Sequence, residues 1–96
     1  EQQEPEQKNL YKQRKEQEAK LRKTRAAIKR AEQEMEQLEQ EMEQVQTRLH
    51  SPEIAADYEA VMELTKELSR LKEQSDSVFL TWSELSEELE QAGESA

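Results

Sequence analysis

The feature that most constrains this chain is a narrow apolar stripe along one helical segment. From Ile28 onward its members are separated alternately by three and four residues. This alternation has the 3.5-residue period of a coiled-coil seam. Because so narrow a stripe cannot bury itself within one helix, the segment is expected to need a partner helix. The stripe consists of Leu21, Ile28, Ala31, Met35, Leu38, Met42, Val45 and Leu49.

Composition supports long helices rather than a globular core. Charged residues make up 39% of the 96 residues, hydrophobic residues 32%, and there is a single glycine. Disorder is the alternative for so polar a chain, but the sustained heptads favour a coiled coil. There is no cysteine, which excludes disulfides and thiolate metal sites. Without a membrane-length apolar run or a signal-peptide pattern, a cytoplasmic protein is expected, with no membrane contact.

A second stripe with the same alternation supplies the partner. Pro52 separates the two stripes, and proline fits the first position of a new helix better than the interior of a long one. Ser51 is expected to cap that short turn, and Asp57 is a candidate second N-cap. The second stripe consists of Val61, Leu64, Leu68, Leu71, Ser75, Val78, Trp82, Leu85 and Leu89.

These patterns predict an all-α fold, a two-helix antiparallel coiled-coil hairpin that is monomeric. An intermolecular coil of straight chains is the alternative. Matching side-chain volumes across the seam predicts that Ala31 faces Ser75 and that Thr24 faces Trp82, with Leu38 opposite Leu68. The expected parts are a linker or disordered segment (1–8), the hairpin (9–91) and a tail (92–96). Within the hairpin, helix 1 spans about 9–49, the turn 50–56 and helix 2 about 57–91.

The charges are distributed unevenly. The net charge is −9, yet residues 8–30 contain ten basic and two acidic residues, a net charge of +8. Such a cluster can neutralise phosphates without reading base sequence. The alternative is pairing within the hairpin, with Glu84, Glu87, Glu88 and Glu90 opposite part of the basic stretch. The candidate nucleic-acid-binding residues are Lys12, Arg14, Lys15, Lys20, Arg22, Lys23, Arg25, Lys29 and Arg30.

No catalytic, cofactor-binding or metal-binding residue is predicted. A single glycine cannot form a phosphate loop, and His50 has no candidate partner for catalysis or metal binding. The acidic run 32–44 is interpreted as the solvated face of a helix. Phe79 borders the seam, which makes it a candidate contact with a neighbouring domain.

Several motifs together resemble a known family. A basic start (LYKQRKEQEAKLRK) is followed by a heptad helix and by Leu49 with Ser51-Pro52-Glu53-Ile54. Asp57-Tyr58-Glu59 and then Trp82-Ser83-Glu84-Leu85 complete the order. From about residue 9 to 91 the chain resembles the C-terminal coiled-coil domain of ABC-F ATPases. That branch of soluble tandem ATPases includes Uup-like proteins and ribosome-associated translation factors.

The resemblance implies a non-catalytic accessory domain. The ATP-binding cassettes, with ATP and Mg²⁺, would belong to the upstream part of a full-length ATPase, which is itself an expected partner. The domain would contact DNA or ribosomal RNA, or position the cassettes, and Lys12 to Arg30 match where nucleic acid would be met. A purely structural hairpin or spacer without nucleic-acid binding is the alternative.

Overall fold

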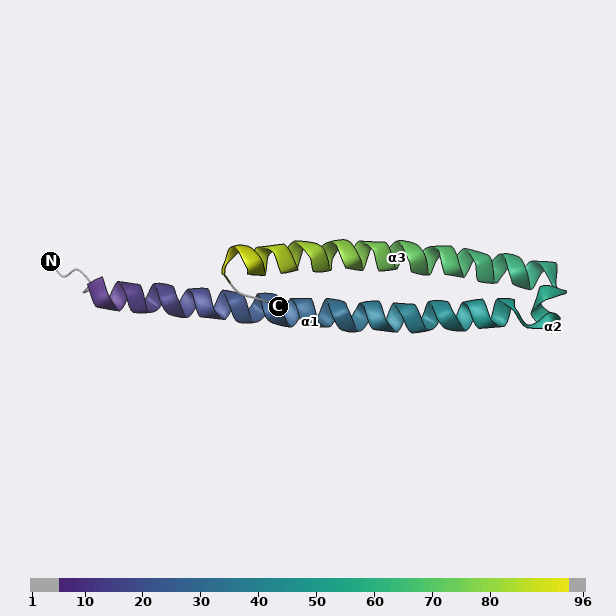
Figure 1. Cartoon of the computed structure of the whole chain (residues 1–96), viewed down its shortest axis with the longest axis horizontal. Helices are drawn as coiled ribbons and strands as arrows, with labels where there is room; N and C mark the ends of the chain where they lie inside the picture. The colour runs from purple at the N-terminus through teal and green to yellow at the C-terminus, as the bar shows by residue number, and fades with distance from the viewer. Residues whose placement is uncertain (1–5, 94–96) are drawn as a thin grey trace.

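Two long helices lie antiparallel along most of the chain (Figure 1). The computed structural model describes residues 6–93, which form α1 (Glu6–Leu49), the short α2 (Pro52–Ala55) and α3 (Tyr58–Gln91). The molecule measures 81 × 25 × 15 Å. The predicted all-α hairpin is therefore confirmed.

The helix limits differ slightly from those expected. α1 begins at Glu6, so residues 6–8 of the expected linker are helical, while residues 1–5 lie outside the described part. At the other end α3 stops at Gln91, and Gly93 has a left-handed φ of 82°, a conformation that glycine adopts without strain. Residues 94–96 of the expected tail lie outside the described residues.

The tip of the hairpin is built from a one-turn helix between two caps. Pro52 occupies the start of α2, and the Ser51 carbonyl accepts a hydrogen bond from the Ala55 amide at 2.8 Å. The Ser51 side chain makes no capping hydrogen bond, whereas the Asp57 carboxylate accepts one from the Ala60 amide at 3.2 Å. Asp57 is therefore the N-cap of α3. Ile54 packs against the core cluster and closes the tip.

The core is a single seam of side chains between α1 and α3. Leu38, Val45, Leu64 and Leu71 form its buried centre. Leu71 is 1% exposed and Leu38 is 3% exposed, which leaves little apolar surface in contact with water. Both predicted stripes therefore face each other, and each helix supplies the partner that the other requires.

The register across the seam differs from the predicted one. Leu21 shares a small cavity with Leu89, not Leu85, and Ala31 lies beside Val78 in a surface hollow. Trp82 bonds to Glu32, about two turns from the Thr24 expected to face it. The predicted pairing was therefore wrong by three to four residues, or about one helical turn, at Leu21 and Ala31, and the Trp82 hydrogen bond reaches further still.

The physical reason is that heptad stripes tolerate more than one register. Moving one stripe by half a heptad still places apolar residues opposite apolar residues, so volume matching alone does not select among these arrangements. The tip adds a constraint that the stripes lack. Because α2 and the Asp57 cap fix where α3 begins, they also fix which residues face each other.

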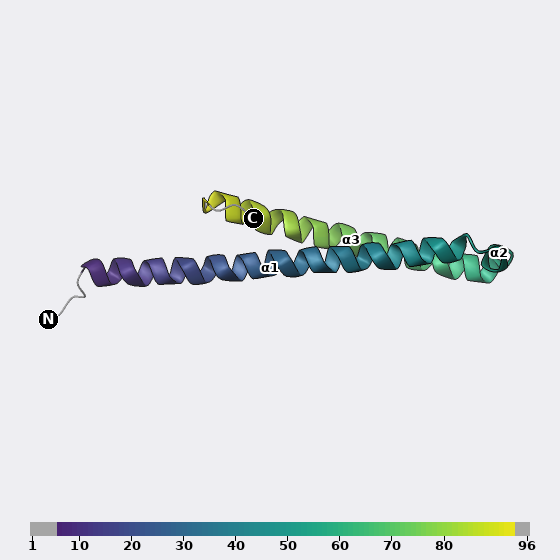
Figure 2. The same ribbon diagram turned by 60° about the horizontal axis from the view of Figure 1, so that its bottom comes forward.

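The helices differ in length, so α1 continues past the end of α3 (Figures 1 and 2). The last residues of α3 reach only Gln17 to Leu21, where Glu88, Leu89 and Ala92 share a cavity with them. About three turns of α1, residues 6–16, therefore extend as a single helix. We call this segment the overhang.

Candidate nucleic-acid interface

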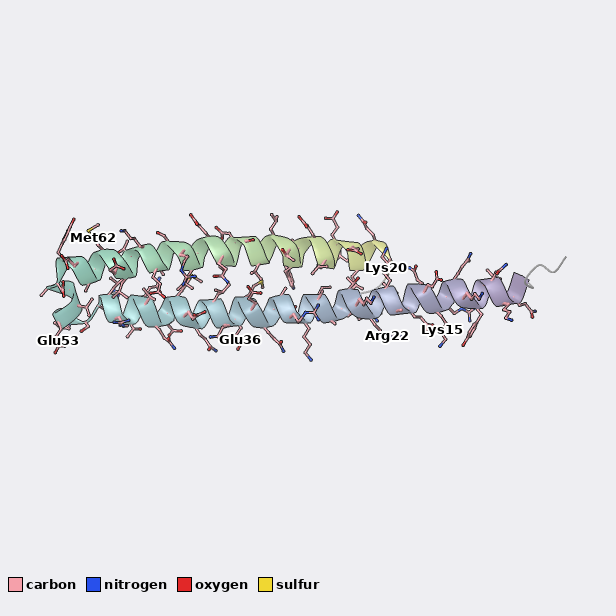
Figure 3. The ribbon with its side chains drawn as sticks, turned by 180° about the vertical axis from the view of Figure 1, so that it is seen from behind. Lys15, Lys20, Arg22, Glu36, Glu53 and Met62 are labelled. Carbon is pink, nitrogen blue, oxygen red and sulfur yellow. The ribbon has the colours of Figure 1, made fainter. Side chains whose placement is uncertain are left out.

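All nine candidate cations are exposed, because each lies on α1 away from the buried seam. The structure divides them into two groups along the helix. Lys12, Arg14 and Lys15 lie on the overhang, while the others lie where α3 runs alongside, from Lys20 to Arg30. Figure 3 shows Lys15 on the single-helix part and Lys20 near the end of α3.

The overhang combines cations with exposed apolar side chains. Leu10 is 53% exposed and Tyr11 is 57% exposed, since no second helix covers this segment. The Lys15 ammonium lies 5.6 Å from the centre of the Tyr11 ring, within the range of a cation–π contact. Lysine and aromatic side chains thus occupy the same face of the overhang.

The second group has acidic neighbours on α3. Lys20 and Glu88 line the same cavity of about 70 Å³ at the end of the hairpin. Within residues 6–93, however, Lys20, Arg22, Lys23, Lys29 and Arg30 form no ion pair with an acid of α3. The predicted alternative, pairing with Glu84, Glu87, Glu88 and Glu90, is thus not realised by these five residues.

This group is further split between two faces of the hairpin. Arg25, Lys29 and Glu32 line a hollow of about 230 Å³ together with Ile28 and Leu89. Arg30 lines a different hollow. The cations beside α3 therefore do not gather on a single face of the hairpin.

Trp82 was expected in the core of the seam, but its side chain is only partly buried. Its indole N–H donates to the Glu32 carboxylate at 3.1 Å, and its ring stacks on Phe79 with the ring centres 5.8 Å apart. Phe79 is 55% exposed, which confirms its predicted position at the border of the seam. Glu32 and Tyr11 were not predicted to take part in specific contacts. The contact of Glu32 with Trp82 depends on the register between the helices. The contact of Tyr11 with Lys15 follows from their i, i+4 spacing on one helix.

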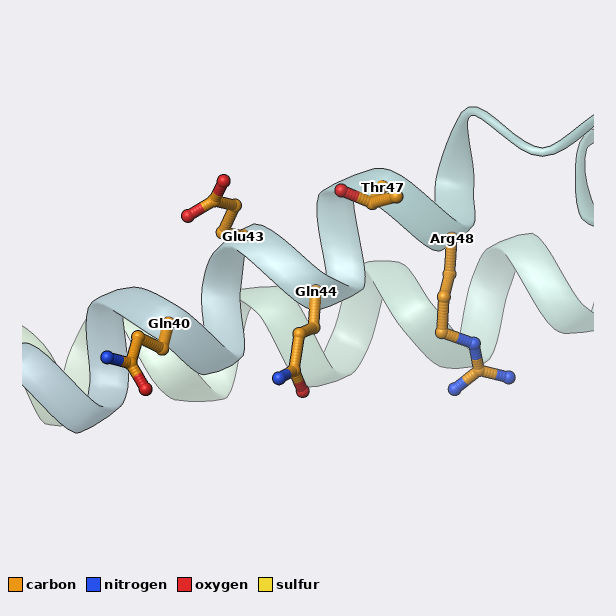
Figure 4. Close-up of a pocket in the computed structure, with 5 residues that line it drawn as sticks. All are labelled: Gln40, Glu43, Gln44, Thr47 and Arg48. Carbon is orange, nitrogen blue, oxygen red and sulfur yellow. The ribbon is translucent and has the colours of Figure 1, made fainter.

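The tip offers no comparable site. A hollow near it is lined by Gln40, Glu43, Gln44, Thr47 and Arg48, all from one helix and of mixed charge (Figure 4). The imidazole N–H of His50 donates from Nδ1 to the Gln46 carbonyl at 2.7 Å, so this histidine caps α1. Across residues 6–93, no three His, Asp or Glu side chains are grouped to hold a metal ion. In the same range, no helix has the length and apolarity to cross a bilayer.

Comparison with known families agrees with this architecture. The family model of the ABC transporter C-terminal domain matches residues 8–87. The chain belongs to this family. The match covers the overhang from Lys8, the tip and most of α3, and it confirms the resemblance drawn from the motifs.

Membership of the ABC transporter C-terminal domain family makes the hairpin an accessory domain of an ABC protein. No curated protein and no solved structure matches the chain.

Proposed function

We propose that this hairpin is a non-catalytic accessory arm of a cytoplasmic ABC-F-type ATP-binding protein and contacts nucleic acid, ribosomal RNA or DNA, through its basic end. ATP and Mg²⁺ would be bound by upstream cassettes. The arm would bring its contact surface to a polyanion, while its acidic tip faces away from phosphate.

The overhang is the observation that carries this proposal. It places Lys12, Arg14 and Lys15 on the part of α1 that extends beyond the end of α3, so the acidic residues of α3 do not flank them. A single α-helix is about 10–12 Å across, and a polyanion can reach it from every side. The six cations from Lys20 to Arg30 then extend the positive surface toward the hairpin.

Charge reversal with a matched control tests the proposal. Lys12, Arg14 and Lys15 are replaced together by Glu, and the control replaces Lys66, Arg70 and Lys72, three cations of α3 nearer the tip. Affinity for labelled RNA and DNA duplexes is measured by fluorescence anisotropy at several salt concentrations. Each lost phosphate contact should reduce the slope of log K against log salt by about 0.9 on B-DNA.

The expected result is strongly weakened binding and a shallower slope for the overhang variant, with the control close to wild type. Equal affinities for the overhang variant and wild type would reject the overhang as the contact surface. Absence of binding by wild type at low salt would favour the alternative, a structural interaction hairpin. The exposed Phe79 ring is the observation that favours this second function.

A further inference from the structure

The face of the hairpin that carries Phe79 has an apolar surface that the chain itself does not cover. Phe79 is 55% exposed and its ring stacks on the half-buried Trp82. Close by, Arg25, Lys29 and Glu32 border a hollow whose floor is formed by the buried Ile28 and Leu89, so Phe79 supplies most of the exposed apolar area. We call this surface, from Arg25 to Glu32 on α1 and from Phe79 to Leu89 on α3, the Phe79 face. Aromatic rings contribute a large apolar area to interfaces, so the exposed Phe79 ring favours a partner.

The charge of α1 changes sign at the level of this aromatic pair. Arg30 is the last cation of the basic stretch and Glu32 is the first of a series of acids. The hydrogen bond from Trp82 to Glu32 places the aromatic stack at this boundary. The Phe79 face therefore has cations on its overhang side and carboxylates on its tip side.

The same change extends over both helices. The basic half, residues 8–30 with residues 77–93, contains ten basic and six acidic residues, a net charge of +4. The tip half, residues 31–76, contains four basic and thirteen acidic residues, a net charge of −9. Two copies aligned in parallel would place the two acidic halves together and repel. Two copies aligned antiparallel would place each basic half against an acidic half.

We propose that the Phe79 face binds a second copy of this chain in an antiparallel, two-fold symmetric dimer, in place of the monomer expected from the sequence. With the symmetry axis near Glu32, the two Phe79–Trp82 pairs meet at the centre, as in a self-complementary interface. Arg25 and Lys29 of each copy then lie near Glu39 and Glu36 of the other. The apolar surface is small compared with a standard interface, so the dimer forms weakly and reversibly.

Sedimentation equilibrium of the full chain tests the association. The variant is Phe79→Ser, and the control is Leu80→Ser, an apolar neighbour that is 61% exposed and lies about 100° further round the helix. Wild type and the control should show the same concentration-dependent dimer, and Phe79→Ser should raise the dissociation constant about tenfold. Helicity measured by circular dichroism verifies that both variants fold.

A wild type that stays monomeric up to millimolar concentration would overturn the proposal, as would equal weakening by Leu80→Ser. Orientation is tested separately by oxidation, because the natural chain has no cysteine. Arg25→Cys mixed with Glu39→Cys should give mixed disulfide dimers, while Arg25→Cys alone should give few. The reverse pattern would indicate a parallel pair and would contradict the proposed charge matching.

Discussion

The replacement Leu71→Ala tests the packing of the hairpin most sharply. Leu71 is 1% exposed and belongs to the central cluster with Leu38. Removing three carbon atoms from a buried side chain costs about 0.8 kcal/mol for each, or roughly 2.4 kcal/mol in transfer free energy. A cavity term would add to this in a globular core, but two helices can close on a gap from both open sides. The expected loss is therefore about 2–3 kcal/mol.

Thermal unfolding followed by circular dichroism at the helical band measures this loss. For a domain of this size, each kcal/mol shifts the midpoint by about 4–8 °C, so Leu71→Ala should lower it by roughly 10–20 °C. The control is Leu80→Ala, because Leu80 lies on the same helix but is 61% exposed and should change stability by at most about 0.5 kcal/mol. A Leu71→Ala midpoint within 3 °C of wild type, or an equal shift in both variants, would refute this seam.

Three further predictions concern the tip, the register and the helix end. Asp57→Ala should cost about 1 kcal/mol in unfolding free energy, since it removes the cap on the Ala60 amide, whereas Ser51→Ala should cost less because its side chain caps nothing; equal losses would contradict this assignment. For the register, a double variant with Leu21→Cys and Leu89→Cys should form an intrachain disulfide faster than one with Leu21→Cys and Leu85→Cys. Mobility on a non-reducing gel measures the two rates, and the opposite order would support the pairing expected from sequence. Gly93→Ala should shorten α3 by fraying, seen as faster amide exchange in its last turn, because alanine disfavours a φ of 82°; unchanged exchange would show that this conformation carries no constraint.

The fold could be predicted from the sequence because its main signals are local and repeated. The 3.5-residue stripes, Pro52 and Asp57 each act on nearby backbone, and the structure places two helices and a turn where they indicate. The family match over residues 8–87 likewise confirms the motif-based resemblance. Local signals that agree with one another leave few alternative folds.

The register and the detailed site required the structure. The pairing of Ala31 with Val78, and of Trp82 with Glu32, depends on the path of the chain through α2, which stripe periodicity does not encode. The charge cluster was visible in sequence, but its division between the overhang and the part beside α3 was not. That division follows from where α3 ends, since Ala92 reaches only as far as the cavity lined by Gln17 and Lys20.

Amide chemical-shift mapping of the full chain during titration with a short nucleic-acid duplex tests the central claim directly. Perturbations should be largest at residues 8–30, with the overhang residues Lys12, Arg14 and Lys15 among the strongest, and should be small at the tip from Glu43 to Glu63. Salt should reduce all of them together, because the contact is to phosphates. Perturbations centred on the tip or on the Phe79 face, or no perturbation at low salt, would contradict a basic end that contacts nucleic acid.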